Sequence, residues 1–426
     1  MKRHAYTFLM FLAIACKESP PEPPKPATLS LRVEDASCTE AWLKASVTQP
    51  PATVRLLRDG QRRSVLRLLT SDSLLLDEGL LPRRTYTYQL QRLAADSSVV
   101  ETSASVQLTT MDTTSHNWSF SIDTLGVTAS SLQDVAIVSE NDVWAVGELY
   151  LNDSTGQLDP ILYNAAHWDG VRWNIIRIPY IYQGSPTYGT IRWIFALNKN
   201  DIWFGNSVHW DGQRFHNVDI GTSIFFGIGS NKMWGSPDGK LYVVGNSGTI
   251  AYSPDHGSTW RRVESGTSVD VQDAWGGSNS LVGGRYVLLP ASNVLTFGQK
   301  KLLRINENGI LDSIIWGMPN RRLRSVWFNA RSKVYVCGGG VFAYTGARWK
   351  EYTEVPLIFT RRIRGKTEND IIVVGDFGLL AHYNGDTWRT YPEADVALWE
   401  SVDVKRNIAI AVGSRNGTAR IAILTR

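Results

Sequence analysis

Short apolar runs separated by polar turns recur along most of the chain. Each clear copy has an apolar strand, a turn built on Asn-Asp, and a second apolar strand ending near Gly or Asn. The best copies are residues 132–148 (LQDVAIVSENDVWAVGE), 191–206 (IRWIFALNKNDIWFGN) and 360–376 (TRRIRGKTENDIIVVGD). Copies with altered turns or weaker patterns are residues 230–246, 271–287, 323–339 and 399–414. The pattern predicts seven copies of one β unit.

A second motif follows most copies. It reads HWDGVRW (167–173), HWDGQRF (209–215), SPDHGSTW (253–260), YTGARW (344–349) and HYNGDTW (382–388). Each has a glycine in a small polar turn and an aromatic residue two or three positions later, which is typical of a β-hairpin. The unit therefore holds four strands in about 35–55 residues, which is the period of a propeller blade.

The ends of the repeat region predict how the ring closes. The last copy stops at Arg426 after its third strand, and an aromatic strand at 117–126 precedes the first copy. We predict that this strand becomes the outer strand of the last blade, so that no edge stays open between the first and last blades. Residues 112–426 are thus predicted to be a seven-bladed β-propeller; a miscounted weak copy would give six or eight blades.

Residues 27–111 also read as short alternating strands, for example 41–48 and 83–93, which predicts a β-sandwich. The stretch LLPRRTY (80–86) resembles the fibronectin type III signature Leu-x-Pro-x-Thr-x-Tyr, with Arg84 in place of Thr. This resemblance implies that Tyr86 is the tyrosine corner and Trp42 the core tryptophan of an early strand. It also implies a spacer role for the domain. The whole chain is then predicted to be all-β.

The segment SPDHGSTW resembles the Asp-box of sialidases and several other β-propellers. The resemblance allows two functions: a carbohydrate-active hydrolase, or a non-enzymatic binding protein such as the photosystem assembly factors and sortilin-type receptors. IRIP (176–179) is similar to the motif carrying the first sialidase arginine, but Arg177 falls in an outer strand. Asp255 is expected to cap its own hairpin. We therefore interpret the Asp-box as a mark of the fold, and assign no catalytic residue.

The N-terminus has the pattern of an export signal. Lys2 and Arg3 precede an apolar run too short to span a bilayer, and residues 1–15 are predicted to be a signal peptide. Small residues before Cys16 resemble a bacterial lipobox, with Ala13 where the family has Leu; the alternative is ordinary secretory cleavage. Residues 16–26 are proline-rich and predict an extended linker. An exported lipoprotein of the outer membrane, facing the periplasm or the surface, is expected.

The net charge and the positions of the cysteines and histidines limit the kinds of partner expected for this chain. The net charge of +4 is too small to indicate nucleic-acid binding. Cys38 and Cys337 lie in different predicted domains, so a disulfide between them is not expected. No His/Cys spacing indicates a metal site, and no cofactor is predicted. His167, His209 and His382 recur before the same turn, which favours packing over metal binding. A monomer is expected.

Ligands of propellers usually meet the channel mouth, where the innermost strands begin. Aligned there, one column holds Gln133, Arg192, Asn231, Gln272, Arg324, Arg361 and either Trp399 or Glu400. The next column holds Asp134, Trp193, Lys232, Asp273, Ser325, Arg362 and Ser401. The candidate ligand-binding residues are Gln133, Asp134, Arg192, Trp193, Gln272, Asp273, Arg324, Arg361 and Arg362.

Arginines with Trp193 nearby suit an acidic or sugar-like ligand. The alternative is that these residues are polar only because a channel holds water. The predicted function is an exported, lipid-anchored protein that binds a protein or glycan at the cell envelope. The alternative is a glycoside hydrolase, for which Asp134 and Asp273 are the best acid pair; it would need two carboxylates about 5–10 Å apart in a pocket.

Overall fold

The computed structural model describes residues 28–221, 223–225, 227–279, 284–293, 299–306, 311–313, 317–318, 320–329 and 333–426. Within these residues the regular elements are strands, apart from three short 3-10 turns: η1 (Asn246–Gly248), η3 (Asp376–Gly378) and η4 (Pro392–Ala394). None of the helical segments in this part of the chain is long and apolar enough to cross a membrane. The all-β prediction agrees with this architecture.

The first domain consists of two antiparallel sheets packed face to face. One sheet contains β1 (Leu29–Ala36), β2 (Glu40–Val47) and β5 (Asp72–Glu78). The other contains β4 (Gln61–Leu68), β3 (Ala52–Arg58) and β6 (Thr85–Leu93), with β7 (Val99–Thr102) and β8 (Val106–Thr109) both paired to β6.

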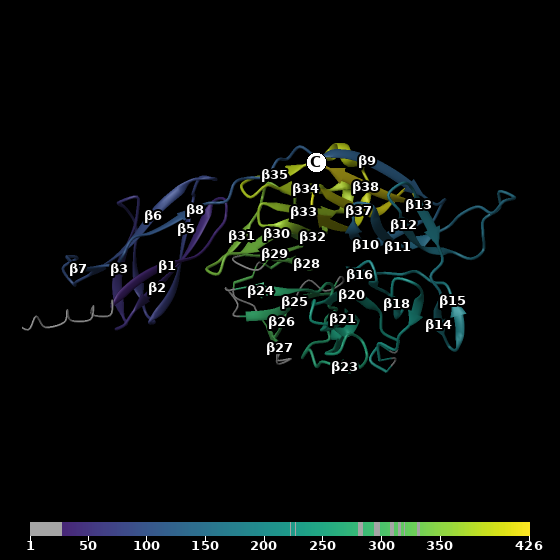
Figure 1. Cartoon of the computed structure of the whole chain (residues 1–426), viewed down its shortest axis with the longest axis horizontal. Coiled ribbons are helices and arrows are strands. Elements are labelled where there is room, and N and C mark those ends of the chain that lie inside the picture. Colours follow the sequence, from purple (N-terminus) through teal and green to yellow (C-terminus); the bar gives the residue numbers. More distant parts are fainter. Residues whose placement is uncertain are drawn as a thin grey trace, which may run out of the picture.

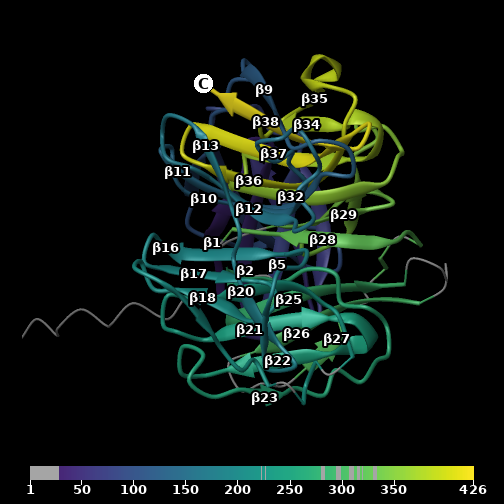
Figure 2. The same ribbon diagram turned by 90° about the vertical axis from the view of Figure 1, so that its right-hand side faces the viewer.

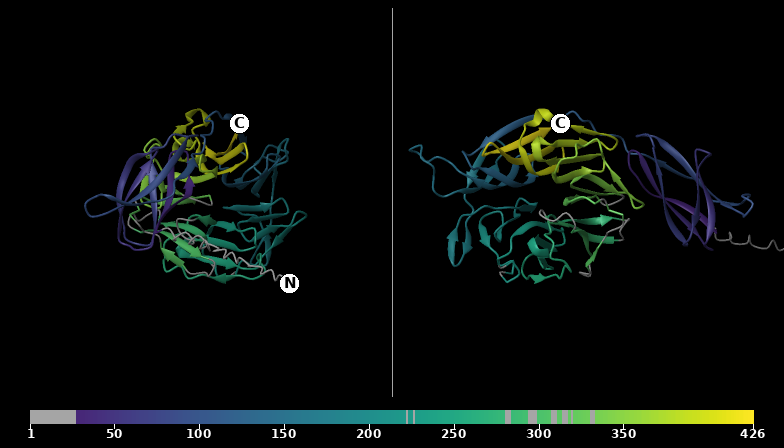
Figure 3. Two further views of the ribbon diagram at one scale, coloured as in Figure 1. Left: turned by 60° about the vertical axis from the view of Figure 1, so that its left-hand side comes forward. Right: turned by 180° about the vertical axis from the view of Figure 1, so that it is seen from behind.

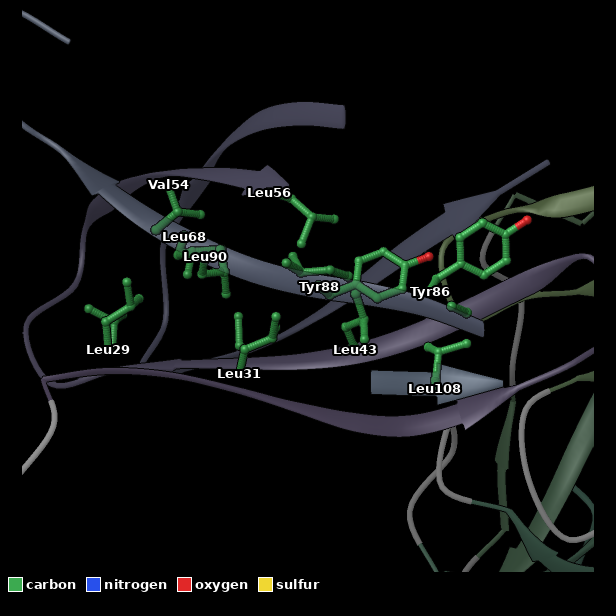
Figure 4. Packing of buried hydrophobic residues seen from close by; sticks show 14 of the residues in the cluster. Leu29, Leu31, Leu43, Val54, Leu56, Leu68, Tyr86, Tyr88, Leu90 and Leu108 are labelled. Atoms are coloured by element: carbon green, nitrogen blue, oxygen red, sulfur yellow. The ribbon is translucent and has the colours of Figure 1, made fainter. Parts of the chain in front are cut away.

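Alternation along each strand builds the core between these sheets. In β6, Tyr86, Tyr88 and Leu90 point inward and meet Leu43 of β2 (Figure 4). The hydroxyl of Tyr86 accepts the backbone N–H of Leu81 at 2.8 Å, which is the bond back to nearby backbone expected of this tyrosine.

Trp42 does not have the position that its resemblance implied. Its neighbours Ala41 and Leu43 belong to the core of the first domain, so the alternation of the strand turns Trp42 to the other face. There the indole is 0% exposed and donates its N–H to the backbone oxygen of Thr345 at 2.8 Å. Trp42 therefore packs against the second domain and is not part of the sandwich core.

A buried ion pair reinforces this contact. Lys333 Nζ lies 2.8 Å from Glu40 Oε2, and the two side chains are 1% and 2% exposed. Lys333 precedes β29 (Val334–Gly338) and Thr345 follows β30 (Gly340–Tyr344). Both strands belong to one sheet of the second domain, beside which the first domain lies in Figure 1. The first domain is thus docked on the second by buried polar contacts.

The remaining strands form seven four-stranded antiparallel sheets in the described part of the chain. The first three are β10 (Ser131–Ser139), β11 (Asp142–Leu149), β12 (Tyr163–Trp168), β13 (Trp173–Ile176); β16 (Ile194–Asn198), β17 (Asp201–Phe204), β18 (Val208–Trp210), β19 (Phe215–Asn217); and β20 (Ser230–Gly235), β21 (Leu241–Gly245), β22 (Ile250–Ser253), β23 (Arg261–Arg262). A hairpin of β14 (Tyr180–Tyr182) and β15 (Ser185–Thr187) lies between the first two.

The next three sheets are β24 (Trp275–Asn279), β25 (Gly284–Ser292), β26 (Lys300–Asn306), β27 (Leu311–Ser313); β28 (Leu323–Trp327), β29 (Val334–Gly338), β30 (Gly340–Tyr344), β31 (Trp349–Glu351); and β32 (Thr360–Thr367), β33 (Asp370–Gly375), β34 (Leu380–Tyr383), β35 (Trp388–Thr390). The last sheet has the order β36 (Leu398–Lys405), β37 (Ile408–Arg415), β38 (Thr418–Thr425) and β9 (Ser119–Leu125). Strand β9 pairs with β38, the partner expected for the strand at 117–126.

The sheets follow one another in chain order around a common centre, as Figures 1 and 2 show. Their first strands line the centre, and β36 contacts β10, so the ring returns to its start. Both faces of a sheet are covered by neighbouring sheets, and therefore central strands such as β33 (DIIVVG) are buried along their whole length. The first domain lies beside this ring in the right-hand view of Figure 3.

Cys38 and Cys337, the two cysteines within the described residues, are free and buried. Burial raises the pKa of the Cys38 thiol and of the Cys337 thiol to about 12, so both stay protonated near neutral pH.

The docking contact predicts a large stability effect. Replacing Lys333 with Met leaves the Glu40 carboxylate buried without its cation, which costs about 3–5 kcal/mol. Denaturant unfolding of the variant should show this loss, and the double variant Glu40→Gln/Lys333→Met should recover part of it. Arg348→Met is the control, because its ion pair with Glu78 is exposed and such pairs contribute about 0–1 kcal/mol. Equal losses in both single variants would contradict the docking role.

Candidate functional site at the centre of the ring

A β-bulge at the start of the inner strands positions the candidate residues. In five of these strands the pairing register skips one residue. The skipped residues are Gln133, Asn231, Arg324, Arg361 and Glu400. They belong to the first column of the aligned copies, and Glu400 rather than Trp399 takes that place in the last copy. Because a bulge re-aims side chains, the residue after it is directed to the axis.

Asp273 is held by cations and a hydroxyl from other sheets. Arg362 Nη1 and Arg364 Nη2 donate to Asp273 Oδ1 at 2.7 and 2.8 Å. Ser325 Oγ donates to the other carboxylate oxygen at 2.6 Å. The Asp273 side chain is 0% exposed.

Asp134 occupies the corresponding position on the first sheet. It pairs with Lys232, accepts the hydroxyl of Ser401 at 2.6 Å, and accepts the backbone N–H of Ile194 at 3.0 Å. Arg362 joins the two acids, because its guanidinium also lies 3.9 Å from Asp134 Oδ1.

We call the set Asp134, Lys232, Asp273, Ser325, Arg362, Arg364 and Ser401 the axial network. With the Ile194 amide, its bonds connect residues in the first strands of six sheets with Asp273, which lies just before β24 of the seventh. Every side chain of the network is buried. The centre of the ring is therefore filled at this level by charged side chains that bind one another.

The acids of the network are ionised. Burial alone would raise the pKa of Asp134, but the charges of Lys232 and Arg362 outweigh it and hold that pKa below its usual value. Burial likewise opposes ionisation of Asp273, and Arg362 and Arg364 hold its pKa well below the usual range. Such carboxylates are poor proton donors, and they are not exposed to a substrate.

The candidate residues therefore separate into two groups. Five are buried within the protein: Asp134, Trp193, Gln272, Asp273 and Arg362. Trp193 donates its indole N–H to Ser230 Oγ at 2.9 Å, and Gln272 donates to the backbone oxygen of Ser292 at 3.0 Å. Arg192 is exposed, and Gln133, Arg324 and Arg361 are half-buried. The five buried candidates do not face solvent because seven sheets converge around them.

The side chains that remain accessible form what we call the entry face: Gln133, Arg192, Arg324, Arg361 and Glu400. Arg361 is paired, with its guanidinium 2.9 Å from Glu400 and 2.5 Å from Asp376. Arg324 donates to the side-chain oxygen of Gln272, an uncharged partner. Burial and the charge of Arg362 lower the pKa of Arg324, which means that its cation is poorly compensated.

Sequence reasoning missed the contribution of Arg364. Its position could have been found from the pattern TRRIRGKT, where a charged residue stands two positions after Arg362 and therefore on the same face of the inner strand. Lys232, Ser325 and Ser401 stood in the aligned second column, but their role as partners of Asp134 and Asp273 depends on distances across the ring.

The recurring histidines each pair within their own sheet. His167 Nε2 lies 2.9 Å from Asp142 and its ring stacks on Trp144; His209 repeats this with Asp201. Asp142 and Asp201, which belong to the Asn-Asp turns, thus also bind a histidine on a neighbouring strand. Among the described residues, no group of three or more His, Cys, Asp or Glu side chains is placed to hold a metal ion.

The residues highlighted by the hydrolase resemblance lie elsewhere. Arg177 pairs with Asp159 at 2.5 Å and covers the ring of Tyr163. Asp255 accepts the backbone N–H and the hydroxyl of Thr259 at 2.8 and 2.7 Å, so it closes its own turn. Neither belongs to the axial network.

Two constraints, the backbone angle and the space beside the residue, require glycine at position 257 in that turn. Its φ is +83°, and a Cβ there would lie 2.3 Å from the ring of Trp203 on the preceding sheet. The turn thus fits closely against its neighbour.

No protein-family model and no curated protein sequence matches the chain. Several solved structures match the chain. The structure of YCF48 bound to a D1 peptide is 14% identical, with 71% of this chain and 94% of that chain covered and a TM-score of 0.52. Virginiamycin B lyase from Staphylococcus aureus is 10% identical, with 73% and 100% covered and a TM-score of 0.51. At these identities the likeness shows the fold alone, which is that of a β-propeller.

The axial network predicts that its acids are structural. Asp273→Asn leaves Arg362 and Arg364 buried with less counter-charge, and should lower the free energy of unfolding by about 3–5 kcal/mol. Urea denaturation would measure it. Asp72→Asn, which removes an exposed partner of Lys44, should leave the free energy of unfolding nearly unchanged. An Asp273→Asn variant as stable as the parent would contradict the network.

Proposed function

We propose that the chain is an exported, lipid-anchored binding protein of the bacterial cell envelope. Its body is a seven-bladed propeller with Asp-box turns, closed by β9, and it carries a fibronectin type III-like domain. The seven four-stranded sheets and the β9–β38 pairing support the blade count. The two packed sheets and the Tyr86 hydrogen bond support the assignment of the first domain.

The entry face binds an acidic segment of a protein partner. The observation that carries this proposal is Arg324: its half-buried guanidinium donates to the neutral side-chain oxygen of Gln272, and its pKa is lowered. A carboxylate would supply the missing charge, and a guanidinium matches a carboxylate in a two-bond geometry. Arg192 lies exposed before β16 as a second contact for such a ligand.

Two further observations favour a protein segment over a glycan at this face. Trp193, the aromatic residue expected to stack on a sugar, is 1% exposed and therefore unavailable. In addition, YCF48, which shares the propeller fold, is described with a bound peptide.

The hydrolase alternative receives less support, because both acids of the best pair are buried and bound to cations. Hydrolysis needs one carboxyl group that can donate a proton and a second that can reach the substrate. Asp134 and Asp273 meet neither need.

The anchor rests on the sequence, since residues 1–15 and the linker 16–26 lie outside the described residues. Cys16 would carry the lipid, and the proline-rich linker would hold the folded body away from the outer membrane. The docked first domain then stands between the linker and the propeller, so it sets the orientation of the entry face.

Arg324→Gln should weaken binding of an acidic peptide about tenfold, which corresponds to about 1.4 kcal/mol. Fluorescence anisotropy with a labelled oligoglutamate peptide, against an oligolysine peptide, measures this. Arg32→Gln is the control, because Arg32 is an exposed arginine of the first domain. Absence of oligoglutamate binding, or equal losses in both variants, would overturn the proposal. Release of sugar from a glycan panel would favour the hydrolase instead.

Cys16→Ser should abolish incorporation of labelled palmitate in a bacterial host and move the protein from the membrane to the soluble fraction. Cys38→Ser, which changes a buried thiol, should leave the incorporation of label unchanged. A labelled Cys16→Ser protein would show that the anchor is elsewhere.

A further inference from the structure

A cavity of about 340 Å³ lies where the ring closes, between the last sheet (β36–β38 with β9) and the first sheet of the ring (β10–β13). Trp168 and Trp173 of the first sheet line it, together with Ile408, Ile410 and Ile423 of the last. These five side chains belong to one apolar cluster that spans the junction. Exposed polar residues of the neighbouring turns complete the lining: Glu140, Asn141 and Asn407.

The strand register shows which residues occupy this place in other sheets. In the first sheet, Trp144 stands two positions after Asp142, the first residue of β11, and pairs with His167 of β12. The second sheet of the ring has the same arrangement with Asp201, Trp203 and His209. The last sheet has isoleucine at all three positions: Ile408, Ile410 and Ile423. The last sheet therefore lacks the indole and the polar pair that the first two sheets have here.

An indole fills the junction that follows each of the first two sheets. Measured between ring centroids, Trp144 lies 6.3 Å from Phe215 of the second sheet. Trp203 lies 6.2 Å from Trp260 of the third sheet. Both indoles are buried, and each donates its N–H to the aspartate of its own strand. Because an isoleucine side chain is smaller than an indole, the last junction has a cavity beside the corresponding aromatic residue, Trp173.

The sheet β32–β35 shows what happens elsewhere when a sheet has no indole of its own at this position. Its residue there is Ile372, which pairs with His382. Trp118, from the segment just before β9, lies against that histidine, with ring centroids 5.7 Å apart. Ile372 and Trp118 belong to one buried cluster. A tryptophan from another segment of the chain thus covers this place, whereas the cavity at the last junction is lined by no tryptophan beyond the two of the first sheet.

We propose that this cavity binds the side chain of a tryptophan in an exposed segment of a protein partner. The indole would lie between Ile410 and Trp173, as the chain's own indoles lie in the equivalent junctions, and burial of its apolar surface favours binding. The volume of the cavity is at the lower end of the range of ligand pockets, about 300–1,000 Å³, which suits one bicyclic ring.

The cavity is separate from the entry face. It lies beside the turns in which β10 and β36 end, whereas the entry face lies where these strands begin. The proposal for the cavity therefore does not depend on the function proposed for the entry face.

The test uses the full chain with Cys16→Ser and N-acetyltryptophanamide, which carries the tryptophan side chain between two amide groups as a protein does. Saturation-transfer NMR detects binding, and N-acetylleucinamide is the comparison. We expect the tryptophan compound to bind and the leucine compound to give a weaker signal. Ile410→Trp places an indole in the cavity, so it should abolish binding. The same variant should unfold at an unchanged or higher urea concentration, because a filled cavity stabilises the fold.

Ile372→Trp is the matched control, because it adds an indole at the same register position where Trp118 already lies. It should leave binding unchanged and lower the urea concentration of unfolding, since extra volume in a filled core is unfavourable. Thr425→Trp is the second variant if Ile410→Trp does not fold. Thr425 is exposed, lines the cavity and stands on the same strand face as Ile423, so an indole there would cover the opening.

The proposal is overturned if N-acetyltryptophanamide does not bind, or if N-acetylleucinamide binds as well. Binding of free indole without binding of N-acetyltryptophanamide would also overturn it, as would undiminished binding to a folded Ile410→Trp or Thr425→Trp protein. Both variants should bind oligoglutamate like the parent. Absence of oligoglutamate binding with the tryptophan compound still bound would overturn only the proposal for the entry face.

Discussion

The buried ion cluster at the axis is the constraint on which the ring depends. Seven sheets converge there, and the strand starts bring two carboxylates and three cations into a space without solvent. Each acid needs its cations, because an isolated buried charge is far less stable than a paired one. Since Arg362 contacts both Asp273 and Asp134, the sheets are coupled through one guanidinium. Because Asp134 and Asp273 are bound to these cations, they stabilise the ring. This argues against a catalytic role for them at the axis.

The same physical rule governs the contact between the domains. Glu40 and Lys333 come from different domains and are buried together, and Trp42 lies against the second domain beside them. A strand buried on both faces cannot be a freely moving spacer, since separation would expose Trp42 and leave two charges unpaired. The docked arrangement gives the first domain a defined direction relative to the ring of sheets.

The entry face is rich in arginine and has its aromatic residue, Trp193, buried, which suits an acidic segment.

The sequence by itself determined the repeating unit and its closure. Period-two strands, glycine turns and the strand at 117–126 are local signals, and local signals are readable without contacts. It also located Tyr86 and the columns of polar residues at the strand starts. It did not determine which of those residues face solvent. A one-residue bulge decides whether a side chain points to the solvent at the channel mouth or to the buried axis. The partners of Asp134 and Asp273 and the outward turn of Trp42 depend on residues distant in the chain. Only the tertiary structure decided them, because burial and charge pairing are properties of the assembled sheets and not of any one segment.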